Sequence, residues 1–211
     1  MGRFTHGPFN PRVNIVGLPV GNSGLPKLPT GSFGYYPYGY PRVLPNPILW
    51  LLADARPALV KAIVALEPLG PPFSKVTIRT APGSPYGISN APLTYDPPVN
   101  DPAVDLVRCQ VKAGVTGLLD GLLQASKSEL PPRKLVNLRD VLVLVVTGQA
   151  SYHAPYDWCT VEYLRQAGVD ADHLKLEDVG ILGNGHMMFL EKNSDRVAQE
   201  VQMWLERILT H

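Results

Sequence analysis

The side chains best suited to chemistry follow three predicted strands, at the point where each strand ends. Glu67 comes directly after an apolar run, residues 147–153 follow the next apolar run, and a loop containing His186 follows the third. Because the carboxyl ends of parallel strands meet at one edge of a sheet, we expect Glu67, His153 and His186 to line one cleft. A carboxylate beside an imidazole is the arrangement of a general acid–base site, so proton transfer is the chemistry to consider first.

His186 is the strongest single candidate, because two flanking glycines allow a tight turn that presents the imidazole as a general base. A histidine in a loop is also often an ordinary surface residue. Glu67 has three interpretations: a cap of a turn, a solvated loop residue, or the acid that orients a catalytic imidazole. His153 either lines the cleft or hydrogen-bonds to a backbone carbonyl, and we expect His153 and its neighbour Tyr152 to bind substrate.

Glu67, His153 and His186 could in principle hold zinc, but the sequence contains no HxH, HExxH or CxxC motif. We therefore expect no metal and no cofactor. Asp157 stands in the first turn of a predicted helix, where a carboxylate complements the helix dipole. Ser151 is the serine that lies nearest the predicted cleft.

The elements that must position these residues follow the order of an α/β protein. An apolar stretch that ends before Pro57 predicts a helix over residues 48–55, and an apolar run bounded by Pro68 predicts a buried strand over 60–66. Residues 141–146 are apolar and largely β-branched, which is typical of a central parallel strand. Further along we expect a helix over 155–167, a short strand over 173–179 and an amphipathic helix over 195–209 that begins at an N-cap, Ser194. This order predicts a partial doubly wound sheet of about three parallel strands with flanking helices.

Residues 68–102 carry many prolines, and we expect a loop insertion over the core there. Beyond it, Asp101 followed by Pro102 predicts the start of a helix over 101–112, and a weaker helical pattern covers 115–125.

Residues 1–46 differ in composition from residues 47–211. Residues 1–47 contain 8 glycines and 9 prolines, and the first acidic residue of the chain is Asp54. With no sustained apolar period, residues 1–46 are predicted to be irregular or disordered. A second interpretation is an interaction arm, because residues 31–40 are rich in tyrosine and glycine.

Charge and hydropathy exclude several classes of protein. The chain of 211 residues has 19 basic and 18 acidic residues and a net charge of +1, which argues against a dedicated binder of nucleic acid or of membrane surfaces. No apolar run is long enough to cross a membrane, and no continuous apolar segment of a secretory signal stands at the start. These features favour a cytoplasmic protein. Cys109 and Cys159 are expected to be reduced thiols, although one disulfide remains open.

Five segments resemble α/β-hydrolase-fold esterases, specifically the C-terminal half of that fold. The matching segments run in order from about Pro47 to the C-terminus and comprise residues 51–57, 60–73, 92–99, 151–157 and 183–188. Related esterases use a Ser–Glu–His triad in which the acid follows the sixth strand rather than the seventh. The resemblance therefore implies Glu67 as orienting acid, His186 as general base and a small-molecule ester as substrate.

The sequence departs from this family at the nucleophile. Aligning the proline of the family's nucleophile turn with Pro47 puts Val43 at the nucleophile position, and valine has no hydroxyl. The sequence has no G-x-S-x-G motif, and no His-Gly-Gly-Gly-type loop to supply donors for an oxyanion. Residues 1–47 offer no counterpart to the first strands of the fold.

These departures lead to two hypotheses. The first is a truncated hydrolase with impaired catalysis, and the second is a non-catalytic remnant or a binding module. With about three strands, one side of the sheet would be an open apolar edge, so we expect marginal stability and self-association through that edge unless a partner covers it.

Overall fold

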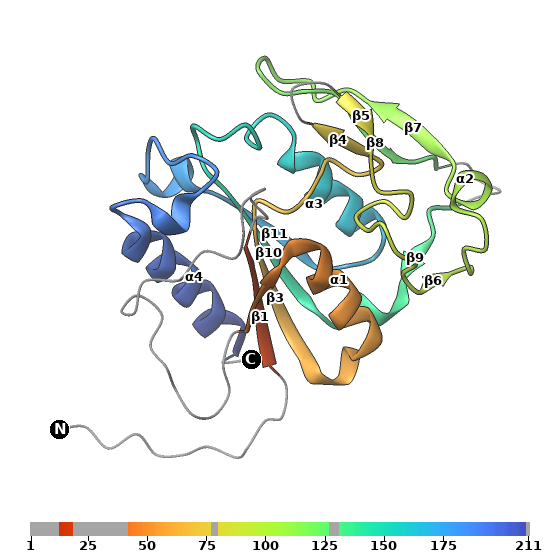
Figure 1. Cartoon of the computed structure of the whole chain (residues 1–211), viewed down its shortest axis with the longest axis horizontal. Helices are drawn as coiled ribbons and strands as arrows, with labels where there is room; N and C mark the ends of the chain where they lie inside the picture. Colours follow the sequence, from red (N-terminus) through yellow and green to blue (C-terminus); the bar gives the residue numbers. More distant parts are fainter. Residues whose placement is uncertain (1–12, 19–41, 77–79, 127–130, 210–211) are drawn as a thin grey trace.

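A five-stranded parallel sheet forms the centre of the molecule in the computed structural model, which describes residues 13–18, 42–76, 80–126 and 131–209 (Figure 1). All four strand pairs are parallel. In spatial order, the strands are β11 (Ala171–Lys175), β10 (Leu142–Thr147), β3 (Val60–Leu66), β1 (Val13–Leu18) and β2 (Arg42–Pro45). The strand order therefore reverses between β1 and β3, and such a reversal opens a crevice at the carboxyl ends of the two strands.

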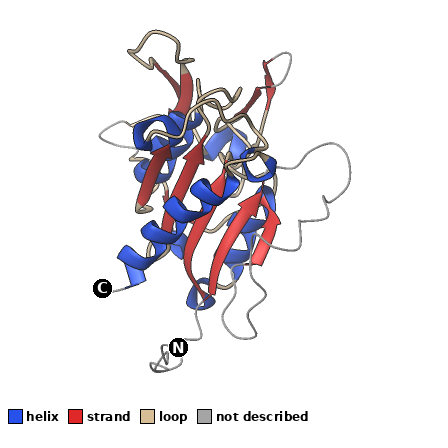
Figure 2. Cartoon of the chain, turned by 90° about the vertical axis from the view of Figure 1, so that its left-hand side faces the viewer, coloured by secondary structure: helices blue, strands red, loops and turns tan. Residues whose placement is uncertain are grey.

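Helices cover both faces of this sheet (Figure 2). Alternate residues of β3 point to opposite sides, so that Ile63 joins one buried cluster and Val64 joins the other. Helices α1 (Asn46–Ala55) and α3 (Asp157–Gln166) pack against the first face, and α4 (Ser194–Leu209) packs against the second. The α/β class and strands β3 and β10 agree with the sequence-based predictions, as do these three helices.

Two strands lie in the segment that was predicted to be irregular. Strand β1 pairs with β3 and with β2, so β3 is an internal strand and not the open edge that we expected. The pattern was hard to read because β1 contains Gly17, β2 is only four residues long, and glycines and prolines surround both. The edges of the described sheet are β11 and β2, and self-association through an edge stays a prediction. The tyrosine-rich arm at 31–40 lies outside the described residues.

The region after the insertion forms a hairpin where two helices were expected. Helix α2 (Pro102–Asp105) does begin with Asp101, whose side chain accepts from the Ala103 N–H, but the helix is one turn long. Strand β7 (Arg108–Val111) then pairs with β8 (Gly121–Gln124), and this hairpin packs on α3. The helical prediction failed because tertiary pairing decided the structure of a short apolar segment whose periodicity was ambiguous.

The remaining elements are short. The proline-rich stretch is mostly loop, as predicted, with two small antiparallel pairs: β4 (Ser74–Val76) with β5 (Thr80–Pro82), and β6 (Tyr95–Asp96) with β9 (Lys134–Leu135). Single 3₁₀ turns are η1 (Pro57–Leu59), η2 (Val136–Leu138), η3 (Leu176–Val179) and η4 (Met188–Leu190). The strand predicted over 173–179 therefore stops at Lys175, where η3 takes over.

Neither cysteine is bonded to another, so Cys109 and Cys159 are free thiols as expected. Among the described residues, no helix combines the length and the apolar character needed to span a bilayer.

Candidate active site

Glu67 is the first residue after β3, and its backbone makes a sharp left-handed turn there. Its φ is 45°, a conformation that is uncommon for a residue with a side chain. The Glu67 N–H still donates to Val146 O on the neighbouring strand, at 3.0 Å, so the turn begins at the sheet itself. Local backbone strain of this kind tends to gather where a side chain must be aimed, and here it aims a carboxylate that is only 1% exposed.

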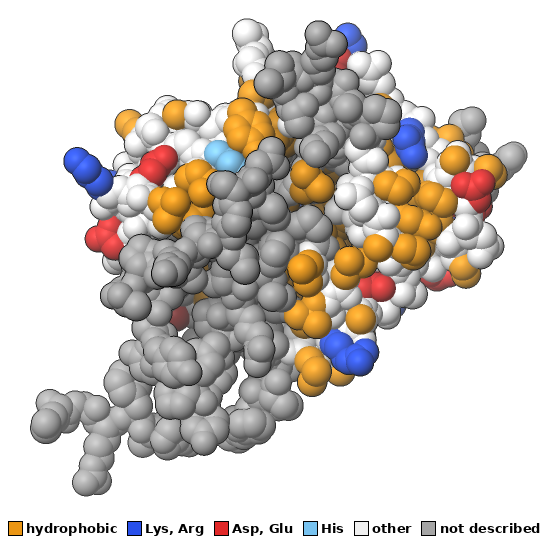
Figure 3. Space-filling view, in the orientation of Figure 1, with side chains coloured by type: hydrophobic (Ala, Val, Ile, Leu, Met, Phe, Trp, Pro, Cys, Tyr) orange, Lys and Arg blue, Asp and Glu red, His pale blue; other side chains and the backbone are white. Residues whose placement is uncertain are grey.

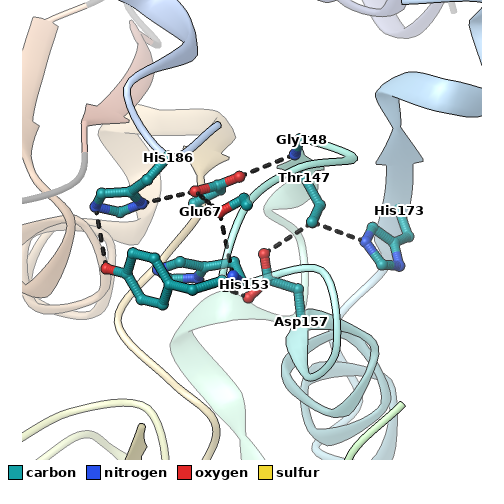
Figure 4. Close-up of polar contacts among 9 residues, drawn as sticks. Glu67, Thr147, Gly148, His153, Asp157, His173 and His186 are labelled. Atoms are coloured by element: carbon teal, nitrogen blue, oxygen red, sulfur yellow. Dashed lines mark hydrogen bonds and ion pairs between the residues drawn. The ribbon is translucent and has the colours of Figure 1, made fainter. Parts of the chain in front are cut away.

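Three donors converge on the Glu67 carboxylate (Figure 4). The Gly148 N–H donates to Oε1 at 2.9 Å, while the Ser151 hydroxyl, at 2.7 Å, and His186 Nδ1, at 2.6 Å, both bond to Oε2. A carboxylate has only acceptor sites, so these three donors hold the Glu67 carboxylate in one orientation. Glu67 is therefore fixed in position and presents negative charge to the imidazole of His186.

His186 lies in a loop that hydrogen bonds fix to its neighbours. Asn184 is fully buried, and its side chain bonds to Glu191 Oε2 at 2.5 Å and to Asn193 Oδ1 at 2.8 Å. The Gly185 N–H donates to Glu191 Oε1, and Asn184 O accepts from the Ala150 N–H, each at 2.9 Å. This loop is thus tied both to the segment after it and to the loop that follows β10.

The two ring nitrogens of His186 have different partners. Since the Glu67 carboxylate can only accept, Nδ1 must carry a proton and donate it. That leaves Nε2 as an acceptor whenever the ring is neutral, and the Tyr152 hydroxyl lies 3.2 Å from it. The side chain of His186 is 19% exposed, so Nε2 faces the solvent side of the site while Nδ1 faces the interior.

A second carboxylate and imidazole lie beside the first. Asp157 is fully buried, and His153 Nδ1 lies 3.0 Å from its Oδ1. The Thr147 hydroxyl lies 2.8 Å from Asp157 Oδ2 and 3.0 Å from His173 Nε2, which extends the network to β11. These residues bring the loop after β10, helix α3 and strand β11 together behind the site.

Burial keeps this second pair neutral. The 3.0 Å contact between His153 and Asp157 has the geometry of an ion pair. However, desolvation lowers the pKa of His153 to about 3 and raises the pKa of Asp157 well above its ordinary value. We conclude that the contact is a hydrogen bond within a neutral pair, because the cost of burying two charges exceeds their attraction here.

The imidazoles of the two pairs stack on each other. Their ring centroids lie 4.7 Å apart, and the ring planes are parallel to within 5°. One nitrogen of each histidine and one oxygen of Glu67 lie within 4.8 Å of one another, which is the donor set of a possible metal site. Yet each imidazole lone pair lies in its own ring plane, and two parallel stacked planes do not meet at one point. Both histidines could bind a single ion only after one ring rotated away from its carboxylate.

The structure thus brings together all four residues that the sequence singled out: Glu67, Tyr152, His153 and His186. Ser151, which we considered as a substitute nucleophile, donates a hydrogen bond to Glu67 and accepts one from the His153 N–H. The Ser151 hydroxyl therefore bonds to the carboxylate and not to the imidazole of His186. Val43, the position of the family's nucleophile, lies in β2 opposite Val16 of β1.

Sequence reasoning missed the second pair. We assigned Asp157 to the first turn of α3 as a dipole partner, and it does stand there, but its buried side chain bonds to His153 and Thr147. The spacing of four residues between His153 and Asp157 is the signal that could have revealed the contact. Nothing in the sequence pointed to His173 as part of the same network.

Comparison with known proteins adds one relative. No family model matches the chain. A fungal protein named "Probable secreted lipase phiG", from Fungal sp. (strain ATCC 74256), is 44% identical over 158 residues, which cover 75% of this chain and 42% of the relative. The chain thus spans less than half of that protein's length. The similarity supports a hydrolase of the lipase or esterase type, and the expectation of a cytoplasmic protein is wrong by this comparison, since the relative is named as secreted.

Proposed function

We propose that this protein is a secreted ester hydrolase with an α/β-hydrolase arrangement, in which His186 is the general base and Glu67 is the acid that orients it. The observation that carries the proposal is the 2.6 Å contact between Glu67 Oε2 and His186 Nδ1 at the carboxyl ends of parallel strands. A relative named as a lipase supports the same chemistry. The substrate would be a small-molecule ester.

The proposed roles follow from the hydrogen bonds. His186 Nε2 takes a proton from an attacking hydroxyl or water, and the imidazolium that forms is stabilised by Glu67. When the bond to the leaving alcohol breaks, the same nitrogen returns the proton to that alcohol. Glu67 is suited to this role because the Gly148 N–H and the Ser151 hydroxyl also donate to its carboxylate and hold it in place.

We also propose that catalysis is weaker than in an enzyme with a serine nucleophile. Val43 offers no hydroxyl. Among the residues that the structure describes, the hydroxyl that hydrogen-bonds to His186 Nε2 is the phenol of Tyr152. A phenol and an aliphatic alcohol differ in nucleophilicity and in acidity, so the rate and the preferred substrate should both change.

The test is hydrolysis of p-nitrophenyl acetate by the full chain and by His186→Gln. We expect the variant to lose about a hundredfold or more in rate, the usual contribution of a positioned general base. Glu200→Gln, on helix α4, is a control for a polar substitution outside the site. Equal rates for the wild type and His186→Gln, with both proteins folded by circular dichroism, would contradict the proposed function and favour a non-catalytic protein.

A further inference from the structure

Tyr152 occupies the place where a nucleophile is expected. In an acid–base–nucleophile site, the carboxylate bonds to one nitrogen of the imidazole and the nucleophile to the other. Here Glu67 bonds to His186 Nδ1 at 2.6 Å, and the Tyr152 hydroxyl lies 3.2 Å from Nε2, so the three groups form a continuous chain of hydrogen bonds. Tyr152 is 53% exposed, so a substrate can reach it from solvent.

The ring of Tyr152 is held in this position by aromatic contacts. Its centroid lies 4.7 Å from that of His186 and 4.5 Å from that of His153, with interplanar angles of 52° and 54°. These tilted contacts limit how far the ring can turn its hydroxyl away from His186. The phenol is therefore positioned as well as exposed.

We propose that Tyr152 is the nucleophile of this site and that it accepts an acyl group from an activated acyl donor with His186 as its base. The inference rests on the proposed function, and it extends that function by naming the nucleophile and the class of substrate. Tyrosine is among the side chains that form covalent intermediates in enzymes.

The reaction balances without any further reactant. The Tyr152 oxygen forms a bond to the acyl carbon, and the phenol proton moves to His186 Nε2. The bond between the acyl carbon and the leaving group then breaks, and His186 gives the proton to the departing oxygen or sulfur. The products are an acyl ester of Tyr152 and a free alcohol or thiol, and water can later cleave that ester with the same base.

The acidity of the leaving group selects the substrate. A phenol has a pKa of about 10, a thiol of about 8.5, and water, which is close to an alkyl alcohol, of about 16. Transfer from an alkyl ester to a phenol is thus uphill, whereas transfer from an aryl ester or a thioester is close to balanced. The site should accept aryl esters and thioesters and should be poor with simple alkyl esters.

The environment of Tyr152 supports a lasting acyl intermediate. Partial burial, reinforced by the negative charge of Glu67, raises the pKa of Tyr152. The phenol consequently stays protonated near neutral pH, so it needs the base to react. A phenol of higher pKa is also a poorer leaving group, so its acyl ester should hydrolyse more slowly.

Mass spectrometry of the acylated protein tests the proposal. The full chain is treated with p-nitrophenyl acetate, phenyl acetate or ethyl acetate, and the modified residue is identified in peptides. We expect one acetyl group on Tyr152 with the two aryl esters and none with ethyl acetate. The Tyr152→Phe variant keeps the ring and should lose this label, the Tyr86→Phe control should keep it, and His186→Gln should slow labelling by about a hundredfold.

The outcomes separate this inference from the proposed function. An acetyl group on Ser151 or another residue, an unmodified Tyr152, or a label on Tyr152 that forms equally fast in His186→Gln would overturn the inference. If release of p-nitrophenol depends on His186 while Tyr152 stays unmodified, the proposed function stands and Tyr152 is not the nucleophile. Site identification in the wild type requires no variant, so a misfolded variant cannot obscure the result.

Discussion

Two carboxylate–imidazole pairs lie side by side in this molecule, and we assign them different roles. The Glu67–His186 pair has its carboxylate inside and its imidazole at the surface of the site, where Nε2 meets the Tyr152 hydroxyl. The Asp157–His153 pair is buried throughout, with side-chain exposures of 0% and 4%. The residue types and contact distances are similar, so the chemistry of each pair depends on its surroundings.

Hydrogen-bond donors and solvent account for the difference. Glu67 receives three donors, including a backbone N–H. The imidazole of His186, its partner, can exchange a proton with groups outside the protein. Burial raises the pKa of Asp157 and lowers that of His153, so the second pair resists charge. We interpret the first pair as the reactive one, and the second as a support on which the ring of His186 stacks.

The largest difference between the pairs should appear in acyl transfer. Glu67→Gln removes the acceptor that fixes the proton on His186 Nδ1, and we expect a loss of about 10³ to 10⁴ fold in the rate of p-nitrophenyl acetate cleavage, as for triads with a disrupted tautomer. Asp157→Asn should reduce the rate by less than about tenfold, because Asp157 touches no reacting group. Equal losses in the two variants would show that the pairs act as one unit.

We expect the opposite order for stability, with a larger loss when Asp157 is replaced than when Glu67 is replaced. Asp157→Ala removes the buried partner of His153 Nδ1 and one of the two partners of the Thr147 hydroxyl, and we expect the free energy of unfolding to fall by about 3 kcal/mol. Glu67→Gln keeps the volume of the side chain and should cost less. Urea denaturation followed by circular dichroism measures both, and a larger loss in Glu67→Gln would reverse our assignment of roles.

Acid should weaken the protein through His153. The pKa of His153 is lowered to about 3 in the folded state from an ordinary value of about 6.5, so the unfolded chain binds a proton that the folded chain does not. Its contribution to stability is complete above the unfolded pKa and declines as the pH falls below about 6.5, by about 2 kcal/mol at about pH 5.

His153→Asn removes this contribution. Asp157 works in the opposite direction, because its pKa is raised, and His173, with a pKa lowered to about 4, adds to the acid sensitivity. Because His153 and Asp157 share a hydrogen bond, the difference between the two pH profiles reports the titration of this pair, while the contribution of His173 is common to both proteins. Identical pH profiles of unfolding would mean that His153 is not held neutral by burial.

The smallest effect is expected at Ser151. Its hydroxyl is one of three donors to Glu67, so Ser151→Ala should cost about 1 kcal/mol of stability and slow acyl transfer by less than about tenfold. Stopped-flow release of p-nitrophenol measures the rate. A loss as large as that of Glu67→Gln would contradict the assignment of Ser151 to a supporting role.

The sequence revealed the parts of this molecule in which pattern and environment agree. Continuous apolar runs identified β3 and β10, and the end of each strand led to Glu67 and to the residues around His153. Because parallel strands bring their carboxyl ends together, three segments far apart in the chain could be assigned to one site from the sequence alone.

Other features depend on contacts that a sequence pattern does not encode. Strands β1 and β2 are defined by pairing with neighbours rather than by their own periodicity, and the hairpin β7–β8 replaced an ambiguous helical pattern. Likewise, the sequence does not distinguish whether Asp157 complements the helix dipole or forms a buried hydrogen bond. The distinction depends on burial, and Asp157 is fully buried. The bond from Tyr152 to His186 joins two loops and had no signal in the spacing.

Nitrogen NMR of His186 tests the central claim, that Glu67 orients this imidazole as a base, without relying on any substrate. In protein labelled with ¹⁵N at histidine, long-range proton–nitrogen correlations show which ring nitrogen carries the proton, and His186→Gln assigns the signals. Above neutral pH, we predict a proton on Nδ1 and a bare Nε2, with this preference lost in Glu67→Gln. A neutral ring with its proton on Nε2 in the wild type would contradict the account.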